Sequence, residues 1–285
     1  MGIKFTSLHE SKPLTSGQPV TLQVPIYGTI HNMMLRFTEA SGAAAAVADI
    51  ISEIQNIRLS FNGRDIVNAS PANIFAMYEA LGLNVFSNTG VVGNIELNLG
   101  RLLFNNPSVR DNFGYGTAGL TTIQATVTAA TLTNVANVQA ISGRTQEQRA
   151  LGTYCKFIDY PQSFNATGDH TVDTLPRDPD SAYAAVLASV GASGAITNGE
   201  VRANNATIME RQPIDTNAQM LSDSRLSSPT GYFPYIFNDG AQDSLLPMQG
   251  VTDLRFITTF GTAPGAAGYI MSALTVNGMA PAAVK

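Results

Sequence analysis

The chain has 285 residues and a formal net charge of −5, with 44% hydrophobic and only 13% charged residues. This length suits two ordinary domains or one large all-β unit, and it suffices to bury a core without disulfides. Basic residues are scattered singly, which argues against direct nucleic-acid binding, and no apolar run approaches the roughly 20 residues of a membrane-spanning helix.

The low share of charged residues suggests that much of the surface meets other protein. The first ten residues lack the long apolar segment of a secretory signal. Gly2 and Thr6 fit the spelling of a myristoylation site, but so short a pattern discriminates poorly.

Alternation of apolar and polar residues dominates the chain and predicts half-buried strands. The clearest alternating segments are residues 20–26, 57–61, 95–99 and 123–127. Turn-forming Asn, Gly and Pro separate these segments, as in "FNGRD" from Phe61 to Asp65. The pattern is typical of an all-β chain.

One segment between these strands predicts a helix over residues 70–82. Ser70 suits the N-cap and Pro71 the first helical position, while Gly82 suits the stop. Ile74, Met77, Tyr78 and Leu81 then form one apolar face at helical spacing. Such a stripe indicates core packing rather than a cofactor site.

The sequence also contains an internal repeat. Residues 61–78 align with residues 203–220 at a constant offset of 142, which pairs Asn62 with Asn204 and Pro71 with Pro213. Gly17 and Gly168 pair at an offset of 151, so the first half should hold a connection nine residues longer, near Ala43–Ala46. The shared order of strand, strand, helix and strand predicts two similar halves.

We therefore predict an all-β fold of two tandem eight-stranded jelly-roll sandwiches, each with a short helix in a connecting loop. Residues 1–135 would form the N-terminal jelly roll and residues 136–285 the C-terminal one.

The stretch "GYGTAG" from Gly114 to Gly119 fits the G-x-G-x-x-G spelling of a dinucleotide-binding loop. A true loop of that kind follows a strand and opens a helix, whereas "LTTIQATV" after it has the alternation of a strand. A similar glycine-rich stretch lies in residues 260–274, so both are interpreted as turns that feed the last strand of each half. No cofactor site is expected here.

Other candidate chemistry is sparse. Cys155 is the one cysteine and is expected to be a small buried residue. His9, His31 and His170 lie far apart without metal-ligand or hydrolase spacing, so no catalytic residues are predicted. Asp173, Asp178 and Asp180 share one loop-like stretch, for which a solvated loop is favoured over a calcium site. Any metal ligands stay unknown, with structural calcium as the one candidate ion.

Three stretches carry a resemblance to a known family: "IRLSFNGRDIVNASPANIFAMY" from Ile57, "YGTAGLTTIQATV" from Tyr115 and "LRFITTFGTAPGAAGYIMSALTVNG" from Leu254. With the repeat, the chain resembles the double jelly-roll major capsid proteins of tailless, internal-membrane icosahedral bacterial viruses. Within these it is most similar to the corticovirus-type coat protein.

The resemblance implies a structural viral protein with no active site. It implies a pseudo-hexagonal homotrimer that tiles an icosahedral shell over an internal membrane. The implied partners are neighbouring capsid trimers, penton and minor capsid or membrane proteins, and the internal lipid, with no direct nucleic acid. The implied location is the virion capsid, assembled in the host-cell cytoplasm.

Two alternatives remain open at this stage. A tandem β-sandwich could bind carbohydrate or a receptor as a spike, for which Tyr232 and Tyr235 in "GYFPYIF" form the candidate aromatic patch. An enzyme is the other alternative, but only the glycine-rich motif supports it.

Overall fold

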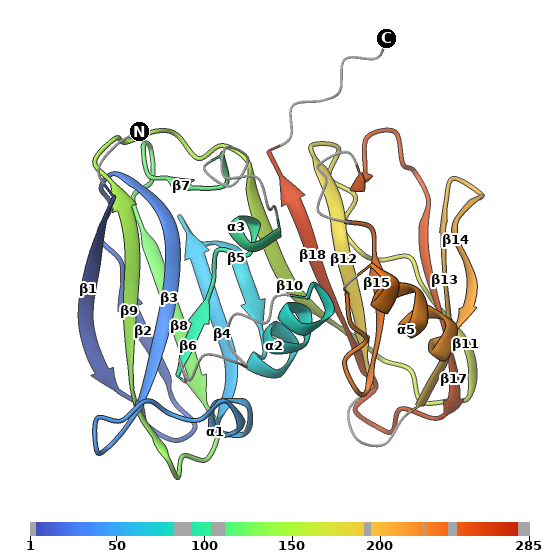
Figure 1. The fold of residues 1–285 in the computed structure, drawn as a ribbon, viewed down its shortest axis with the longest axis horizontal. Helices are drawn as coiled ribbons and strands as arrows, with labels where there is room; N and C mark the ends of the chain where they lie inside the picture. Colours follow the sequence, from blue (N-terminus) through green and yellow to red (C-terminus); the bar gives the residue numbers. More distant parts are fainter. Residues whose placement is uncertain are drawn as a thin grey trace. The chain divides into compact units, whose positions relative to one another are not determined.

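The computed structural model describes residues 4–82, 93–103, 112–190, 195–224, 226–238 and 244–278 (Figure 1). The chain divides into two compact units. Unit 1 draws on Met1–Ile74 and Leu83–Ile158, and unit 2 draws on Phe75–Gly82 and Asp159–Lys285.

Unit 1 contains two sheets and the helices α1 (Val47–Glu53) and α3 (Gly100–Leu103). One sheet has the order β1-β9-β3-β6 with β7 beside β3, and the other contains β2-β8-β4-β5. The strands are β1 (Lys4–Pro13), β2 (Pro19–Gln23), β3 (Thr29–Glu39), β4 (Ile54–Phe61), β5 (Arg64–Ala69), β6 (Asn94–Glu96), β7 (Tyr115–Gly116), β8 (Ile123–Ala129) and β9 (Val135–Thr145).

Unit 2 repeats this arrangement with one sheet of order β10-β18-β12-β15, with β16 beside β12, and another of order β11-β17-β13-β14. The helix α5 (Ile214–Asp223) follows β14. The strands are β10 (Tyr154–Gln162), β11 (Gly168–Val172), β12 (Ser181–Ser189), β13 (Ala195–Ala203), β14 (Ala206–Pro213), β15 (Tyr232–Ile236), β16 (Leu246–Pro247), β17 (Leu254–Thr262) and β18 (Tyr269–Asn277).

Each unit is therefore a jelly roll of eight strands, with one further two-residue strand, in the described residues. The first, eighth, third and sixth of the eight form one sheet, and the second, seventh, fourth and fifth form the other. This is the predicted fold of two tandem eight-stranded jelly rolls.

The hairpin between the fourth and fifth strands shows the repeat at atomic detail. Asn62 and Asn204 begin the two-residue turns of β4–β5 and β13–β14, and both have φ = 48°. Asn62 Oδ1 accepts hydrogen bonds from the backbone N–H groups of Thr121 and Thr122 at 2.7 and 3.0 Å. Asn204 Oδ1 accepts the equivalent bonds from Thr252 and Asp253 at 2.9 and 3.2 Å. Asparagine suits this place because it tolerates a left-handed backbone and its amide oxygen binds local N–H groups.

The connection between the third and fourth strands explains the change of offset. In unit 1 it comprises residues 40–53 and includes α1, whereas in unit 2 it comprises residues 190–194. The connection in unit 1 is therefore nine residues longer than that in unit 2, which equals the difference between the two sequence offsets. The sequence prediction placed the insertion at the correct connection but did not identify α1 as a helix.

Helix α2 (Pro71–Ala80) follows the predicted pattern closely. The Ser70 hydroxyl accepts a hydrogen bond from Asn73 N at 3.3 Å, and Gly82 has φ = 66° just beyond the last turn. Ile74 and Met77 are fully buried. The second half of α2 belongs to unit 2, where Ser227 N donates to Ala80 O at 3.2 Å.

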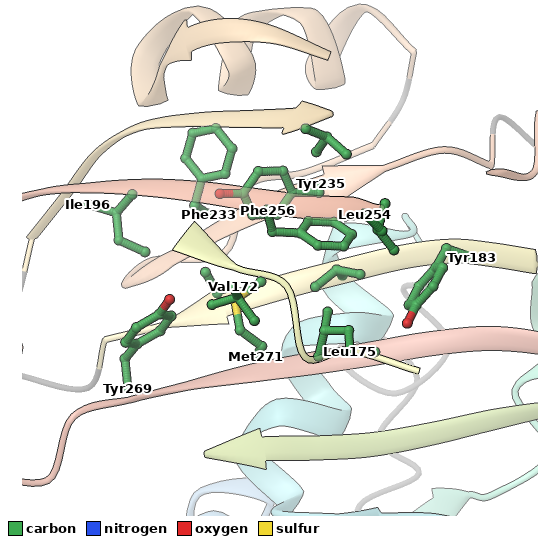
Figure 2. Close-up of a cluster of buried hydrophobic side chains, with 14 of the residues drawn as sticks. Val172, Leu175, Tyr183, Ile196, Phe233, Tyr235, Leu254, Phe256, Tyr269 and Met271 are labelled. Carbon is green, nitrogen blue, oxygen red and sulfur yellow. The ribbon is translucent and has the colours of Figure 1, made fainter. Parts of the chain in front are cut away.

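The core of unit 2 lies between its two sheets and is rich in aromatic side chains (Figure 2). Tyr235 of β15 and Phe256 of β17 meet edge to face, with ring centroids 5.4 Å apart. Phe260 and Tyr269 pack with centroids 4.9 Å apart. Such contacts add to the large apolar area that each ring buries.

The predicted boundary between residues 135 and 136 differs from the division seen in the structure. Strand β9 begins at Val135 and lies between β1 and β3, with Met34 opposite Ile141. It is therefore the last strand of unit 1, which extends to Ile158. The prediction took β8 as the last strand because β9 does not alternate cleanly: Ser142 and Arg144 are both fully buried in it.

Candidate functional site

The three histidines lie on three different strands, and each is engaged in the packing of its own unit. On β1, His9 Nε2 lies 2.9 Å from Ser142 Oγ, and on β3 His31 Nε2 lies 3.1 Å from Thr145 Oγ1. Burial, and then the charge of Arg144, lower the pKa of His9. On β11, His170 Nδ1 lies 2.8 Å from the Tyr269 hydroxyl, and burial lowers the pKa of His170.

Cys155 has 1% of its surface exposed, as predicted, and burial raises the pKa of its thiol. The three aspartates do not form a metal site in this structure. Within the described ranges, no three His, Cys, Asp or Glu side chains come together to hold an ion. At Asp178 the backbone oxygen accepts hydrogen bonds from Ser181 N and Oγ, which closes a turn before β12.

The glycine-rich stretch at residues 114–119 is followed by strand β8 and not by a helix, as predicted. Gly119 has φ = 80°, which fits a turn residue. Gly114 and Gly116 are needed for a different reason. A Cβ at Gly114 would lie 2.8 Å from the Arg149 guanidinium, and one at Gly116 would collide with the backbone oxygen of Ala150.

The supposed echo in residues 260–274 is not equivalent to this stretch. Residues 114–119 lie before the seventh strand of unit 1, whereas the segment between Thr262 and Tyr269 lies after the seventh strand of unit 2. The true counterpart in unit 2 is the turn at Gly250, whose carbonyl accepts a hydrogen bond from Asn204 Nδ2 at 2.9 Å. The sequence interpretation failed because it matched glycine content rather than strand order.

The aromatic patch expected for a carbohydrate-binding spike is not a surface feature. Tyr235 has 0% of its surface exposed, and its hydroxyl lies 2.8 Å from Thr258 Oγ1. Tyr232 is half-buried at the start of β15, and burial raises the pKa of its phenol. The Tyr235 ring belongs to the core of unit 2, so the two rings do not form an exposed stacking platform for sugars.

A row of paired charges crosses one sheet of unit 2. Arg211 on β14 contacts Asp169 on β11 and Glu200 on β13. Glu200 also pairs with Arg202 on its own strand. The hydrogen bond from Thr259, and then Arg211, lower the pKa of Asp169. These charges satisfy one another and leave this face mixed in sign.

The most informative surface feature is a pair of sheet edges. Strand β1 is the last strand of its sheet in unit 1, and β14 is the last strand of its sheet in unit 2. Each presents a large apolar side chain to solvent: Leu8 on β1 is 66% exposed and Ile208 on β14 is 45% exposed. An open edge with an apolar side chain readily pairs with another chain, and proteins ordinarily protect such edges.

The edge of unit 1 that corresponds to β14 is covered. Within unit 1, the middle of β10 pairs in parallel with β5, placing Phe157 opposite Val67 and Ile158 opposite Asn68. In β5, Ile66, Val67 and Ala69 are buried, whereas six of the eight residues of β14 are exposed. The sequence does not reveal this difference, because both strands carry the same kind of adjacent apolar pair, Ile66–Val67 in β5 and Ile208–Met209 in β14.

Two open sheet edges and the double jelly roll are thus the main features of the structure, and the double jelly roll is shared with known structures. The structure resembles that of the major capsid protein P2 from bacteriophage PM2, with a TM-score of 0.80 over 96% of this chain and 97% of that chain at 15% identity. It also resembles a chain in the atomic structure of Sulfolobus turreted icosahedral virus, with a TM-score of 0.70 over 97% and 91% of the two chains at 12% identity. A quasi-atomic model of the PBCV-1 virus capsid gives 0.65 over 99% and 97% at 10% identity.

These likenesses establish the double jelly-roll fold of viral capsid proteins over nearly the whole chain. More particularly, residues 154–276 match the family model of the viral coat protein P2 C-terminal domain. That segment begins at β10 and ends in β18, so it includes all eight long strands of unit 2. No curated protein matches the sequence significantly. Among the described residues, no helix is long and apolar enough to cross a membrane.

Proposed function

We propose that this chain is the major capsid protein of an icosahedral virus, in which three copies form a pseudo-hexagonal homotrimer that tiles the shell over an internal membrane. The observation that carries the proposal is the double jelly-roll fold over 96% of the chain, together with the coat-protein domain at residues 154–276. Two similar units per chain give six in a trimer, so one protein can fill a hexagonal lattice.

The partners in this proposal are neighbouring trimers, penton and minor capsid or membrane proteins, and the internal lipid. The chain would occupy the virion capsid after assembly in the host-cell cytoplasm. It would have no catalytic role and no direct contact with nucleic acid, which agrees with its net charge of −5 and scattered basic residues. The burial of Tyr235 leaves the carbohydrate-binding alternative without one of the two residues that motivated it.

Size-exclusion chromatography with light scattering tests the proposal. The expected result is a mass about three times the 30.1 kDa of one chain, with hexagonal outlines in negative-stain images. A mass of one chain at every concentration tried would contradict it.

A further inference from the structure

We propose that β14 is the edge on which a second copy of the chain docks, and that β1 of that copy pairs with it. This inference rests on the proposed function, since it names the surfaces through which copies join. It follows from the internal repeat, from the pairing of β5 with β10, and from two of the sheet edges that stay open in the described residues, those of β1 and β14.

The covered edge supplies the template. Within unit 1, the fifth strand of the jelly roll, β5, is paired in parallel by Phe157 and Ile158 of β10. In the sheet order of unit 2, β10 occupies the place that β1 occupies in unit 1. The structure therefore shows a first strand of a jelly roll pairing with the free edge of a fifth strand.

One fifth strand and one first strand remain without a partner on their outer edges in the described residues, and these two could form the same kind of pair. After β10 has paired with β5, the unused fifth strand is β14 and the unused first strand is β1, and both end their sheets in the described part of the chain. A second copy can repeat the same junction by laying its β1 along β14. The contact joins two different surfaces, so it is head-to-tail and closes into a ring when the rotation allows it.

The side chains at the two edges fit such a junction. Ile208 is 45% exposed on β14, and Met220 is 52% exposed on α5, which packs against β14. Leu8 is 66% exposed near the middle of β1. Arg211 is already bound by Asp169 and Glu200, and Glu210 is a further exposed charge on β14. Pairing would satisfy the edge backbone groups and bury these apolar side chains.

Cross-linking between two differently sized chains tests the pairing. A tagged Leu8→Cys chain and an untagged Ile208→Cys chain are mixed, reassociated and treated with a short bismaleimide. The native Cys155 is buried at 1% exposure and should not react. The expected product is a covalent heterodimer of the tagged and untagged chains.

The matched control replaces Ile208→Cys with Thr171→Cys, an exposed position on β11 at the opposite edge of the same sheet. This control should give little heterodimer. Equal yields from both mixtures would overturn the inference. So would a trimer seen by light scattering whose Leu8→Cys and Ile208→Cys chains do not cross-link, an outcome that leaves the proposed function standing. Absence of any oligomer in the unmodified chain would overturn both.

A substitution without cross-linking gives an independent readout. Ile208→Lys places a charge on the edge and should weaken association by about tenfold or more, from the lost burial of one large apolar side chain. Ile51→Lys, at a 40% exposed position on α1, is the matched control and should leave association unchanged. Both variants should melt like the parent as isolated chains, and equal association of the two would contradict the inference.

Discussion

The fifth strands of the two jelly rolls, β5 and β14, occupy the same place in the fold but have different surroundings. Both begin after a turn at an asparagine with φ = 48° and both lead into a helix. Strand β5 is covered by β10 and buries Val67 completely. Strand β14 has no strand on its outer edge in the described residues and exposes Ile208.

The helices that follow differ in the same direction. Helix α2 buries Ile74, Met77 and Tyr78, whereas α5 buries Asn217 and Leu221 and exposes Met220. The repeat has thus kept the topology while changing which strands and helices are covered within the chain. The comparison shows that the fifth strand of unit 1 is paired on its outer edge, whereas the fifth strand of unit 2 ends its sheet in the described residues.

The largest expected difference concerns Tyr78 and Met220, which lie 142 positions apart at equivalent places in the repeat. Tyr78→Ala should lower the free energy of unfolding by about 3–5 kcal/mol, because its ring is 2% exposed. Met220→Ala should change it by less than about 0.5 kcal/mol in the isolated chain. Urea unfolding measures both, and equal losses would remove the contrast between the helices.

A second contrast concerns the connection between the seventh and eighth strands. In unit 1, Glu53 accepts hydrogen bonds from the backbone N–H groups of Thr133, Asn134 and Val135 at 2.9–3.1 Å. In unit 2, Gly265 N donates to the neutral amide oxygen of Asn165 at 3.1 Å. Glu53→Ala should cost about 2–3 kcal/mol by leaving buried donors unpaired.

The same carboxylate predicts a pH dependence. Burial raises the pKa of Glu53, but the N–H donors of Thr133, Val135 and Asn134 outweigh it and hold the pKa below the ordinary value of 4.5. A lowered pKa in the folded state means that the stabilisation is present above about pH 4.5 and is lost as the pH falls through the folded pKa. Unfolding curves from pH 6 to 3 should therefore fall less steeply for Glu53→Gln than for the parent, while Asn165→Ala should keep the parent slope.

A smaller effect tests the feature that the two units share. Asn62→Ala and Asn204→Ala should each cost about 1–2 kcal/mol, since each loses an acceptor of several hydrogen bonds and must hold a left-handed backbone without asparagine. The neighbouring Asn205→Gly, at φ = 65°, serves as the control and should be neutral or slightly stabilising. Markedly unequal losses at Asn62 and Asn204 would show that the two turns are not equivalent in energy.

The smallest expected effect concerns calcium at the loop that holds Asp173, Asp178 and Asp180. A site with an affinity 100 times tighter than the added concentration would stabilise unit 2 by about 2.7 kcal/mol. We expect no resolvable change in Tm on adding calcium or EDTA, because the structure does not bring these carboxylates together. A rise in Tm abolished by Asp178→Asn would assign unit 2 a stabilising ion.

Much of the fold could be predicted from the sequence because local patterns determine it. The alternation at residues 57–61 and 123–127 became β4 and β8, and Ser70, Pro71 and Gly82 marked the ends of α2. The offset of 142 pairs the two asparagines correctly, because each is determined locally by a short turn with a left-handed backbone. The fold class could be predicted because the same order of strands and helix occurs in both halves of the sequence.

The rest depends on contacts between residues far apart in sequence. Strand β9 was missed because Arg144 is buried in it, where its guanidinium donates to the carbonyl oxygens of Pro25 and Tyr27 at 2.7 and 2.8 Å and lies over the Tyr27 ring. The pairing of β5 with β10 brings residues 67 and 157 together, and no local sequence pattern predicts this contact. The exposure of Ile208 could not be predicted from the local pattern, because the covered strand β5 and the open strand β14 both contain two adjacent apolar residues.

A cryo-electron microscopy reconstruction of the purified oligomer is the most direct measurement. We predict three copies around a threefold axis, six jelly rolls in a pseudo-hexagonal ring, and β1 of each copy paired with β14 of the next. A monomeric particle, or an assembly of any other symmetry, would contradict the proposed capsid trimer.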